Sequence, residues 1–259
     1  MFSEKAKRLF SKADIGSMRN IKIIIEYDGT HFNGWQFQPH HRSVQGELQR
    51  AVKQITAEQV TVEGAGRTDT GVHARGQVGN FKMEKDMGLP ELMKGLNAVL
   101  PEDVRIKAIS QVDMNFHSRF SAKERRYKYY MVQSPVSIGR QYYWYYPHHL
   151  DFEIMKSACN LLIGQKSFRS FCLSRAEVSH YICEVRKAEW YEKDGVKIFE
   201  IHANRFLHNM VRTIVGTFVN LGRGRITYDD LVSIMEKEDR RVAGFSAPAE
   251  GLFLEEVVY

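Results

Sequence analysis

The sequence predicts an α+β protein made of two ferredoxin-like halves that are related by pseudo-symmetry. Strand and helix patterns in the first half follow the order β-α-β-β-α-β, which is the ferredoxin-like arrangement. A similar order of elements recurs in the second half, although no stretch of sequence is repeated. We therefore expect mainly antiparallel sheets with helices on one face, and a basic cleft between the two halves.

Alternating and periodic apolar residues define the elements of the first half. Ile21, Ile23 and Ile25 alternate with polar residues, which is typical of a strand. Ser43 is placed to cap a helix whose apolar residues share one face, and Pro90 opens a second helix. The remaining strands of this half are expected at residues 60–63, 77–83 and 104–108.

The second half contains further strand and helix signals. Asp151 is placed to cap a helix that Gly164 ends. The turn Lys193-Asp-Gly195 joins two strands and is a strong hairpin signal. The other expected elements are a strand at 126–132, an aromatic extended stretch at 142–146, the hairpin strands at 185–192 and 196–202, helices at 206–221 and about 228–237, and a last strand at 252–257.

We expect three parts along the chain. Residues 1–18 are predicted to be a disordered N-terminal extension, because their basic and apolar residues precede the first strand pattern. Residues 19–115 are predicted to form an N-terminal α+β domain, and residues 116–259 a C-terminal α+β domain.

The composition narrows the class of protein. The 259 residues are 43% hydrophobic and 26% charged, as in an ordinary globular protein with its own core. A net charge of +6 favours an anionic partner. Three cysteines without a Cys-x-x-Cys pair argue against a zinc site or a disulfide framework, and no apolar run is long enough to span a membrane. We therefore expect a cytoplasmic protein without a metal.

The most distinctive stretch is the loop Gly64-Ala-Gly-Arg-Thr-Asp-Thr-Gly-Val-His-Ala74, which lies between two expected strands. Its glycines allow tight turns and close approach of a ligand, and they place Arg67 and Asp69 at the tip. A nucleotide P-loop is excluded because no Gly-Lys-Ser/Thr follows, and a dinucleotide fingerprint is excluded because position 69 is not glycine. A structural turn with a solvated Arg–Asp pair remains open.

Basic and aromatic residues are interleaved in residues 121–130, whose sequence is Ser-Ala-Lys-Glu-Arg-Arg-Tyr-Lys-Tyr-Tyr. On a strand, Tyr127 and Tyr129 share one face while Lys128 takes the other. Such a pattern suits a nucleic-acid backbone with a stacked base. An ordinary strand with an aromatic core face and a solvated basic face explains the same residues, so the segment alone does not decide between the two.

The segment Arg205-Phe-Leu-His-Asn-Met-Val-Arg-Thr-Ile-Val-Gly216 combines an apolar stripe with three basic residues. Arg205, His208 and Arg212 are spaced i, i+3 and i+7, and we expect them on one face of a helix. An arginine beside so much apolar surface needs a partner, yet residues 204–228 contain no acidic residue. Asp69 is the candidate partner, because a cation in contact would keep a carboxylate ionised in an apolar pocket.

These motifs together resemble the tRNA pseudouridine synthase A family. The resemblance is carried by Gly66-Arg-Thr-Asp-x-Gly-Val-His-Ala74 and by Phe-x-His-x-Met-Val-Arg-x-Ile-Val-Gly in residues 206–216, and it extends over nearly the whole chain from Arg19 onward. It implies that Asp69 is the catalytic residue and that Arg212 pairs with it. It also implies that Arg126-Tyr127 matches a pair whose tyrosine lines the uracil pocket.

The resemblance implies an activity and a set of binding residues. The activity is isomerisation of uridine to pseudouridine in tRNA, at positions 38 to 40 of the anticodon stem-loop, by a homodimer without a cofactor or metal. Tyr127 would pack on the uracil and could receive the C5 proton, and Arg67 would fill the space left by the displaced base. The predicted substrate-binding residues are Arg67, Arg126, Tyr127, Arg205 and His208.

Two other functions remain to be weighed. A pseudouridine synthase could act on ribosomal RNA instead of tRNA, and residues Lys166 and Arg169 make one loop more basic than the family pattern, which bears on substrate choice. A catalytically silent RNA-binding protein is the other alternative, against which the complete set Arg67, Asp69, Tyr127 and Arg212 argues.

Overall fold

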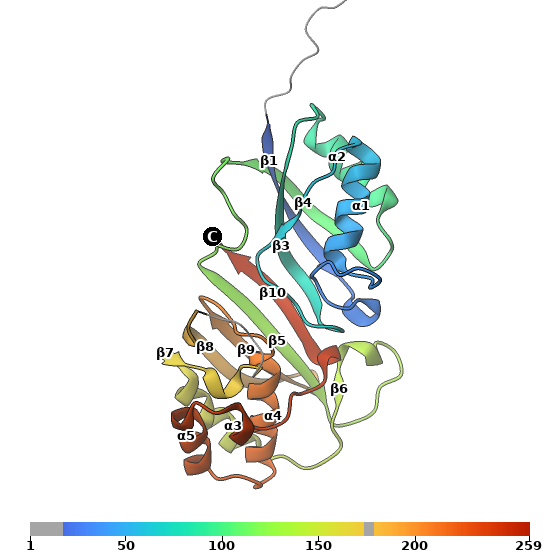
Figure 1. The fold of residues 1–259 in the computed structure, drawn as a ribbon. Helices are drawn as coiled ribbons and strands as arrows, with labels where there is room; N and C mark the ends of the chain where they lie inside the picture. Colours follow the sequence, from blue (N-terminus) through green and yellow to red (C-terminus); the bar gives the residue numbers. More distant parts are fainter. Residues whose placement is uncertain (1–17, 174–178) are drawn as a thin grey trace, which may run out of the picture.

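The computed structural model describes residues 18–173 and 179–259, and Figure 1 shows its mixed α+β architecture. The predicted extension at residues 1–18 lies outside the described residues except for Met18. Within the described part, one sheet contains ten strands: β1 (Arg19–Tyr27), β2 (Glu63–Gly64), β3 (His73–Met83), β4 (Val104–Val112), β5 (Glu124–Val132), β6 (Trp144–Tyr145), β7 (Gly164–Ser167), β8 (Ile182–Lys193), β9 (Val196–Ala203) and β10 (Leu252–Val258). The helices are α1 (Val44–Thr56), α2 (Leu89–Val99), α3 (Phe152–Ala158), α4 (Met210–Gly222) and α5 (Tyr228–Lys237).

The sheet is continuous across both halves of the chain. Its order is β4-β1-β3-β10-β5-β9-β8-β7, with β2 paired to β3 and β6 paired to β5. Strand β10 is the link, because it runs parallel to β3 of the first half and antiparallel to β5 of the second. Most of the other pairs are antiparallel, so the predicted α+β class and mainly antiparallel pairing are confirmed. The pseudo-symmetry of the halves stays a prediction.

The first half has the predicted order β1-α1-β2-β3-α2-β4. The Ser43 hydroxyl accepts a hydrogen bond from the Gly46 N–H, as expected of a helix cap. The strand expected at 60–63 is reduced to the short β2. The reason is that α1 satisfies the backbone of Val62, which donates to Gln49 Oε1 and accepts from Gln45 Nε2.

The second half differs from the prediction in two elements. Strand β7 was not predicted, and it pairs with β8 at the outer edge of the sheet. Helix α4 begins at Met210 rather than at residue 206, because Asn209 has a left-handed backbone with φ +64° and ends the preceding turn. The predicted helix face containing Arg205, His208 and Arg212 is therefore wrong, since only Arg212 lies on the helix.

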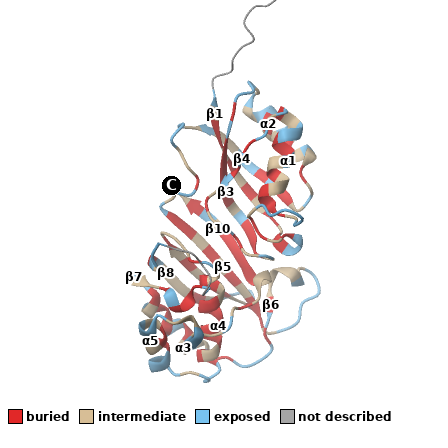
Figure 2. Cartoon of the chain, in the orientation of Figure 1, coloured by how far each residue is buried: buried red, intermediate tan, exposed pale blue. Residues whose placement is uncertain are grey.

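Helices α1 and α2 lie beside β1, β3 and β4, whereas α3, α4 and α5 gather at the other end of the molecule (Figure 1). Buried residues run through the middle of the sheet and along α4 in Figure 2. Every residue of α4 is buried except Arg212 and Asn220. A side chain at Gly216 would clash with the Phe245 carbonyl, so the segment before β10 packs directly on α4.

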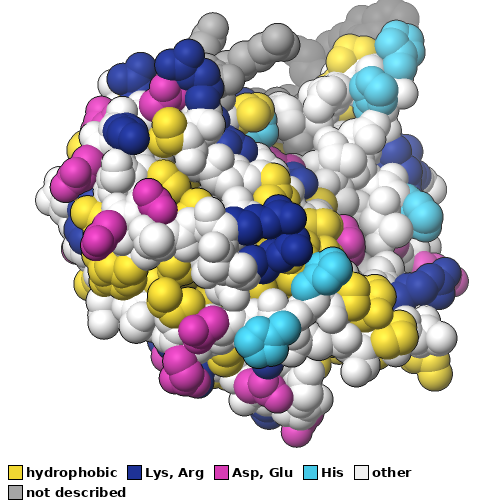
Figure 3. All heavy atoms as spheres, turned by 90° about the horizontal axis from the view of Figure 1, so that it is seen from below, with side chains coloured by type: hydrophobic (Ala, Val, Ile, Leu, Met, Phe, Trp, Pro, Cys, Tyr) yellow, Lys and Arg dark blue, Asp and Glu magenta, His cyan; other side chains and the backbone are white. Residues whose placement is uncertain are grey.

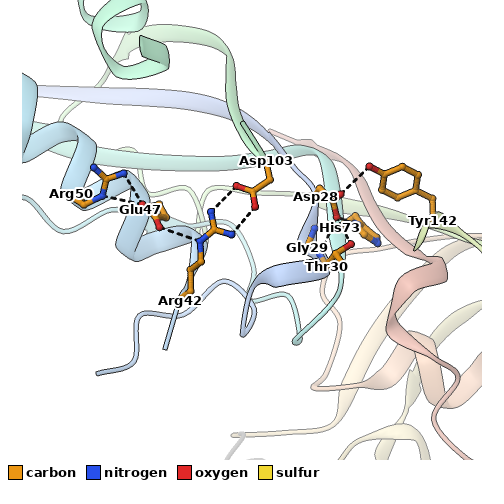
Figure 4. Close-up of polar contacts among 9 residues, drawn as sticks. All are labelled: Asp28, Gly29, Thr30, Arg42, Glu47, Arg50, His73, Asp103 and Tyr142. Carbon is orange, nitrogen blue, oxygen red and sulfur yellow. Dashed lines mark hydrogen bonds and ion pairs between the residues drawn. The ribbon is translucent and has the colours of Figure 1, made fainter. Parts of the chain in front are cut away.

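A polar cluster fixes the start of β3, where the Asp69 loop ends (Figure 4). The Gly29 N–H donates to Nδ1 of His73 over 2.9 Å, and the hydroxyl of Tyr142 donates to the Asp28 carboxylate over 2.9 Å. Nε2 of the buried His73 lies 3.1 Å from the carbonyl of Gln141. Because Gln141 and Tyr142 belong to the second half, these contacts attach that half to the beginning of β3.

In residues 18–173 and 179–259, no helix combines the length and the apolar character needed to cross a membrane. The same residues contain no group of three or more His, Cys, Asp and Glu side chains arranged to hold a metal ion.

Candidate active site

The loop between β2 and β3 holds Asp69 through backbone hydrogen bonds. The Trp35 N–H donates to the carbonyl of Thr68 over 3.1 Å, and the Val72 N–H donates to the carbonyl of Asp69 itself over 3.1 Å. Gly71 has φ +78°, in the region that favours glycine, and its N–H donates to the Phe32 carbonyl. The Asp69 backbone is thus fixed on both sides.

A hydrogen bond between two buried hydroxyl groups also supports this loop. Oγ1 of Thr68 lies 2.7 Å from the hydroxyl of Tyr27, and both residues are buried. Burial raises the pKa of Tyr27, so its phenol stays protonated at neutral pH. Gln77 also contributes, because its Nε2 donates to the carbonyl of Gly66 over 2.9 Å. Tyr27 on β1 and Gln77 on β3 therefore hold the loop that carries Asp69 against the sheet.

The Asp69 carboxylate meets two basic side chains from the second half of the chain. One oxygen lies 3.3 Å from Nη1 of Arg212, and the other lies 3.3 Å from Nε2 of His208. The Asp69 and Arg212 side chains are each 20% exposed, whereas His208 is 52% exposed. The carboxylate is thus held by an inner guanidinium and an outer imidazole, and it keeps a route to solvent.

Arg212 is itself fixed by backbone contacts. Its Nε donates to the carbonyl of Ala247 over 2.7 Å, and the Ala247 N–H donates to the carbonyl of Arg212 over 2.9 Å. Tight packing at Gly216 keeps the same segment on α4. The guanidinium therefore reaches Asp69 from a rigid position, which limits the entropy lost in forming the pair.

Electrostatics favour a charged His208. The hydrogen bond to Asp69 raises the pKa of His208, while partial burial and the charges of Arg212 and Arg67 lower it, and the net shift is upward. Below that raised pKa the imidazolium adds a second positive charge next to the carboxylate. Two cations then face the Asp69 carboxylate.

Tyr127 provides an aromatic surface near this group. It lies on β5, is 7% exposed, and packs edge-to-face on Phe206 with ring centres 5.0 Å apart. Burial, followed by the nearby Tyr27 and the charge of Asp69, raises the pKa of Tyr127. Its phenol is therefore protonated at neutral pH.

Comparison with known proteins identifies the family. A sequence model of the tRNA pseudouridine synthase family matches residues 23–121 and 158–259. The chain belongs to the tRNA pseudouridine synthase family.

Individual members of the family match over almost the full chain. A protein of Acetivibrio thermocellus named tRNA pseudouridine synthase A is 42% identical over 244 residues, which cover 93% of this chain and 100% of that protein. Proteins of the same name from Thermoanaerobacter sp. and Chlorobium limicola are 41% and 39% identical, again over 93% of this chain and 100% of theirs.

Not every predicted site residue of this tRNA pseudouridine synthase family member lies at Asp69. Arg67 is exposed, and its charge acts on His208. Arg205 lies before α4, and its Nη1 is 3.2 Å from Nε2 of His180. Arg126 pairs with Glu124 and Glu256, at 2.7 and 2.6 Å. Because neighbouring strand residues point to opposite faces, the structure does not bring Arg126 to the face of Tyr127.

Sequence reasoning missed Arg125, which shares the face of Tyr127. Arg125 is 8% exposed. Its two terminal nitrogens donate to four backbone carbonyls, those of Ala65, Arg119, Ala122 and Asn204. The alternation of the strand was the signal that could have selected Arg125 over Arg126. This arginine joins the Asp69 loop, the segment between the halves, and the approach to α4.

A cavity formed by the described residues lies away from Asp69. It has a volume of about 810 Å³ and is lined by residues that include Arg169, Tyr181, Arg240 and Arg241. Arg169 lies 5.2 Å above the ring of Tyr181. Asp69 is not among its lining residues. The basic cleft between the halves therefore stays a prediction.

Proposed function

We propose that this protein isomerises uridine to pseudouridine in tRNA and that Asp69 is its nucleophile. The observation that carries the proposal is the meeting of the Asp69 carboxylate with Arg212 and His208, which come from the other half of the chain. Family membership supports the same reaction, as does the name tRNA pseudouridine synthase A of the relatives.

The reaction needs no group donor, because uridine and pseudouridine have the same atoms. Asp69 attacks C1′ of the ribose, and the bond between C1′ and N1 of uracil breaks. The uracil turns while it is held, C5 forms a bond to C1′, and Asp69 leaves with its electron pair. C5 loses its hydrogen as a proton and N1 gains a proton, so the reaction requires neither an oxidant nor a reductant.

The residues around Asp69 have different roles in the proposed reaction. Arg212 and protonated His208 orient the nucleophile and balance its negative charge. Tyr127 packs on the uracil. Arg67, which is exposed beside Asp69, fills the space of the base that leaves its stack. Arg205 contacts the substrate outside this group.

The substrate and the assembly are part of the same proposal. A net charge of +6 suits a polyanion, and in the view of Figure 3 Lys and Arg side chains gather in clusters beside histidines and exposed hydrophobic groups. We propose uridines at positions 38 to 40 of tRNA as targets, a cytoplasmic homodimer as the working form, and domains at residues 19–115 and 116–259.

The test is release of tritium from tRNA labelled at C5 of uracil. The wild type should release the label, and Asp69→Asn should release it at least about 1,000-fold more slowly, because the nucleophile is lost. Asp86→Asn is the matched control, since the Asp86 side chain is 93% exposed. Release by Asp69→Asn at the wild-type rate would exclude this mechanism.

A further inference from the structure

A braced turn with an exposed aromatic ring lies between the two halves, at residues 117–121. The Ser121 N–H donates to the carbonyl of His117 over 2.9 Å, and the His117 N–H donates to the Ser121 hydroxyl over 3.1 Å. The hydroxyl of Tyr259 donates to the carbonyl of Ser118 over 2.7 Å. Backbone and side-chain contacts thus hold the turn from two directions.

The side chain of Phe120 projects from this turn into solvent. The residue is 76% exposed, although large aromatic side chains usually contribute to a core. One side of its ring rests on His117, with ring centres 4.4 Å apart, and the guanidinium of Arg119 lies 5.5 Å from its centre. An aromatic ring with a cation beside it can stack on a nucleobase.

The turn lies close to the Asp69 loop. Nη2 of Arg125 donates to the carbonyls of both Ala65 and Arg119, over 2.9 and 2.5 Å. Two acceptors of one nitrogen lie within a few ångström of each other, and Ala65 precedes Asp69 by only four residues. A nucleotide stacked on Phe120 would therefore be near a uridine held at Asp69.

The surroundings of the turn carry unbalanced positive charge. Burial lowers the pKa of Arg125, Tyr127 and Tyr259 oppose this shift, and the like charges of Arg119 and Arg205 add to it, so both of these guanidinium groups repel that of Arg125. Within residues 18–173 and 179–259, none of the three forms an ion pair with a carboxylate. Electrostatic repulsion between these cations is unfavourable, and an anionic ligand such as a phosphodiester would relieve it.

We propose that Phe120 is a stacking platform for a nucleotide of the RNA next to the target uridine. His117 supports the ring from behind, and Arg119 and Arg205 bind the adjoining phosphates. This inference rests on the proposed function, because it adds a recognition site to the same RNA substrate. An RNA nucleotide is favoured over a second protein chain because the arginines near the ring have no carboxylate partner in residues 18–173 and 179–259, and a phosphate would neutralise them.

The first experiment compares Phe120→Ala with Phe120→Trp. Phe120→Ala should raise both Kd for tRNA and KM by about 5- to 100-fold, with little change in kcat, because one stacking contact is lost. Phe120→Trp should stay near the wild type, since it keeps an aromatic face. Ile138→Ala is the control, because Ile138 is 96% exposed and lies on another loop.

A second experiment identifies the stacked base. Anticodon stem-loops with a single abasic nucleotide at each position next to the target are bound to wild type and to Phe120→Ala. One abasic position should weaken binding to the wild type and leave binding to Phe120→Ala unchanged. This loss of additivity would show that the ring and that base contact each other.

The outcomes separate this inference from the proposed function. If the wild type releases tritium but Phe120→Ala has unchanged Kd and KM, the platform is refuted and the isomerase stands. If Phe120→Ala changes only the sedimentation of the protein, the ring is a contact between chains. If the wild type binds tRNA through Phe120 without releasing tritium, the platform stands and the isomerase fails.

Discussion

Arg212 and Arg125 both connect the two halves of the chain, but they do so with different partners. Arg212 meets the carboxylate of Asp69, whereas Arg125 meets four backbone carbonyls. The first contact matches charge with charge, and the Asp69 carboxylate stays 20% exposed. The second contact satisfies hydrogen bonds without neutralising the guanidinium. The comparison shows how one architecture separates a proposed catalytic pair from a buried arginine that links backbone segments.

Loss of the Arg212 guanidinium should give the larger effect on catalysis. Arg212→Met should slow single-turnover tritium release by about 100- to 1,000-fold, because it removes the inner cation that faces and orients the Asp69 carboxylate. Arg50→Met is a suitable control, since Arg50 is 52% exposed and forms an ion pair with Glu47 on the surface of α1. A loss of less than about threefold would mean that Arg212, like Arg125, has only a structural role.

Arg125 should matter mainly for stability and for binding. Arg125→Met should lower the free energy of unfolding by about 2–4 kcal/mol, because buried carbonyls lose their donors. Its neighbour Arg126 pairs on the other face, and Arg126→Met should cost at most about 1 kcal/mol. Urea unfolding followed by circular dichroism measures both. Equal losses of unfolding free energy for the two variants would contradict the assignment of Arg125 as the arginine that links the backbone segments.

His208 should give the smallest effect, and one that depends on pH. Its folded-state pKa is raised by Asp69, so the attraction is complete below about pH 6.5 and is lost as pH rises through the raised pKa. Because the His208 side chain is 52% exposed, we expect less than about 1 kcal/mol from it. His208→Gln should flatten this part of the pH profile of kcat/KM. A profile identical to the wild type would exclude a charged partner at this position.

Local patterns in the sequence predicted most elements of the fold. The alternation in β1 and the caps at Ser43 and Asp151 are interactions between near neighbours, so they can be read from the chain. The insertion of β10 between β3 and β5 could not be predicted in this way, because its partners are distant along the chain. The left-handed conformation of Asn209 was equally hidden, and it displaced the start of α4.

The candidate site was predictable where a charge lacked a local partner. The absence of acidic residues near Arg212 indicated a distant carboxylate, and the structure brings Asp69 to it. The role of Arg125 was not predictable, because its acceptors are backbone carbonyls that every residue carries. Residue types alone therefore predict ion pairs better than they predict an arginine that links backbone carbonyls.

Chemical rescue of Arg212→Ala tests the central claim most directly. The claim is that Asp69 works only while a cation from the second half faces it. Guanidinium ion at concentrations that leave the protein folded should restore tritium release to Arg212→Ala, and urea, which is neutral and of similar shape, should not. Equal release with guanidinium, with urea and with neither would contradict the account.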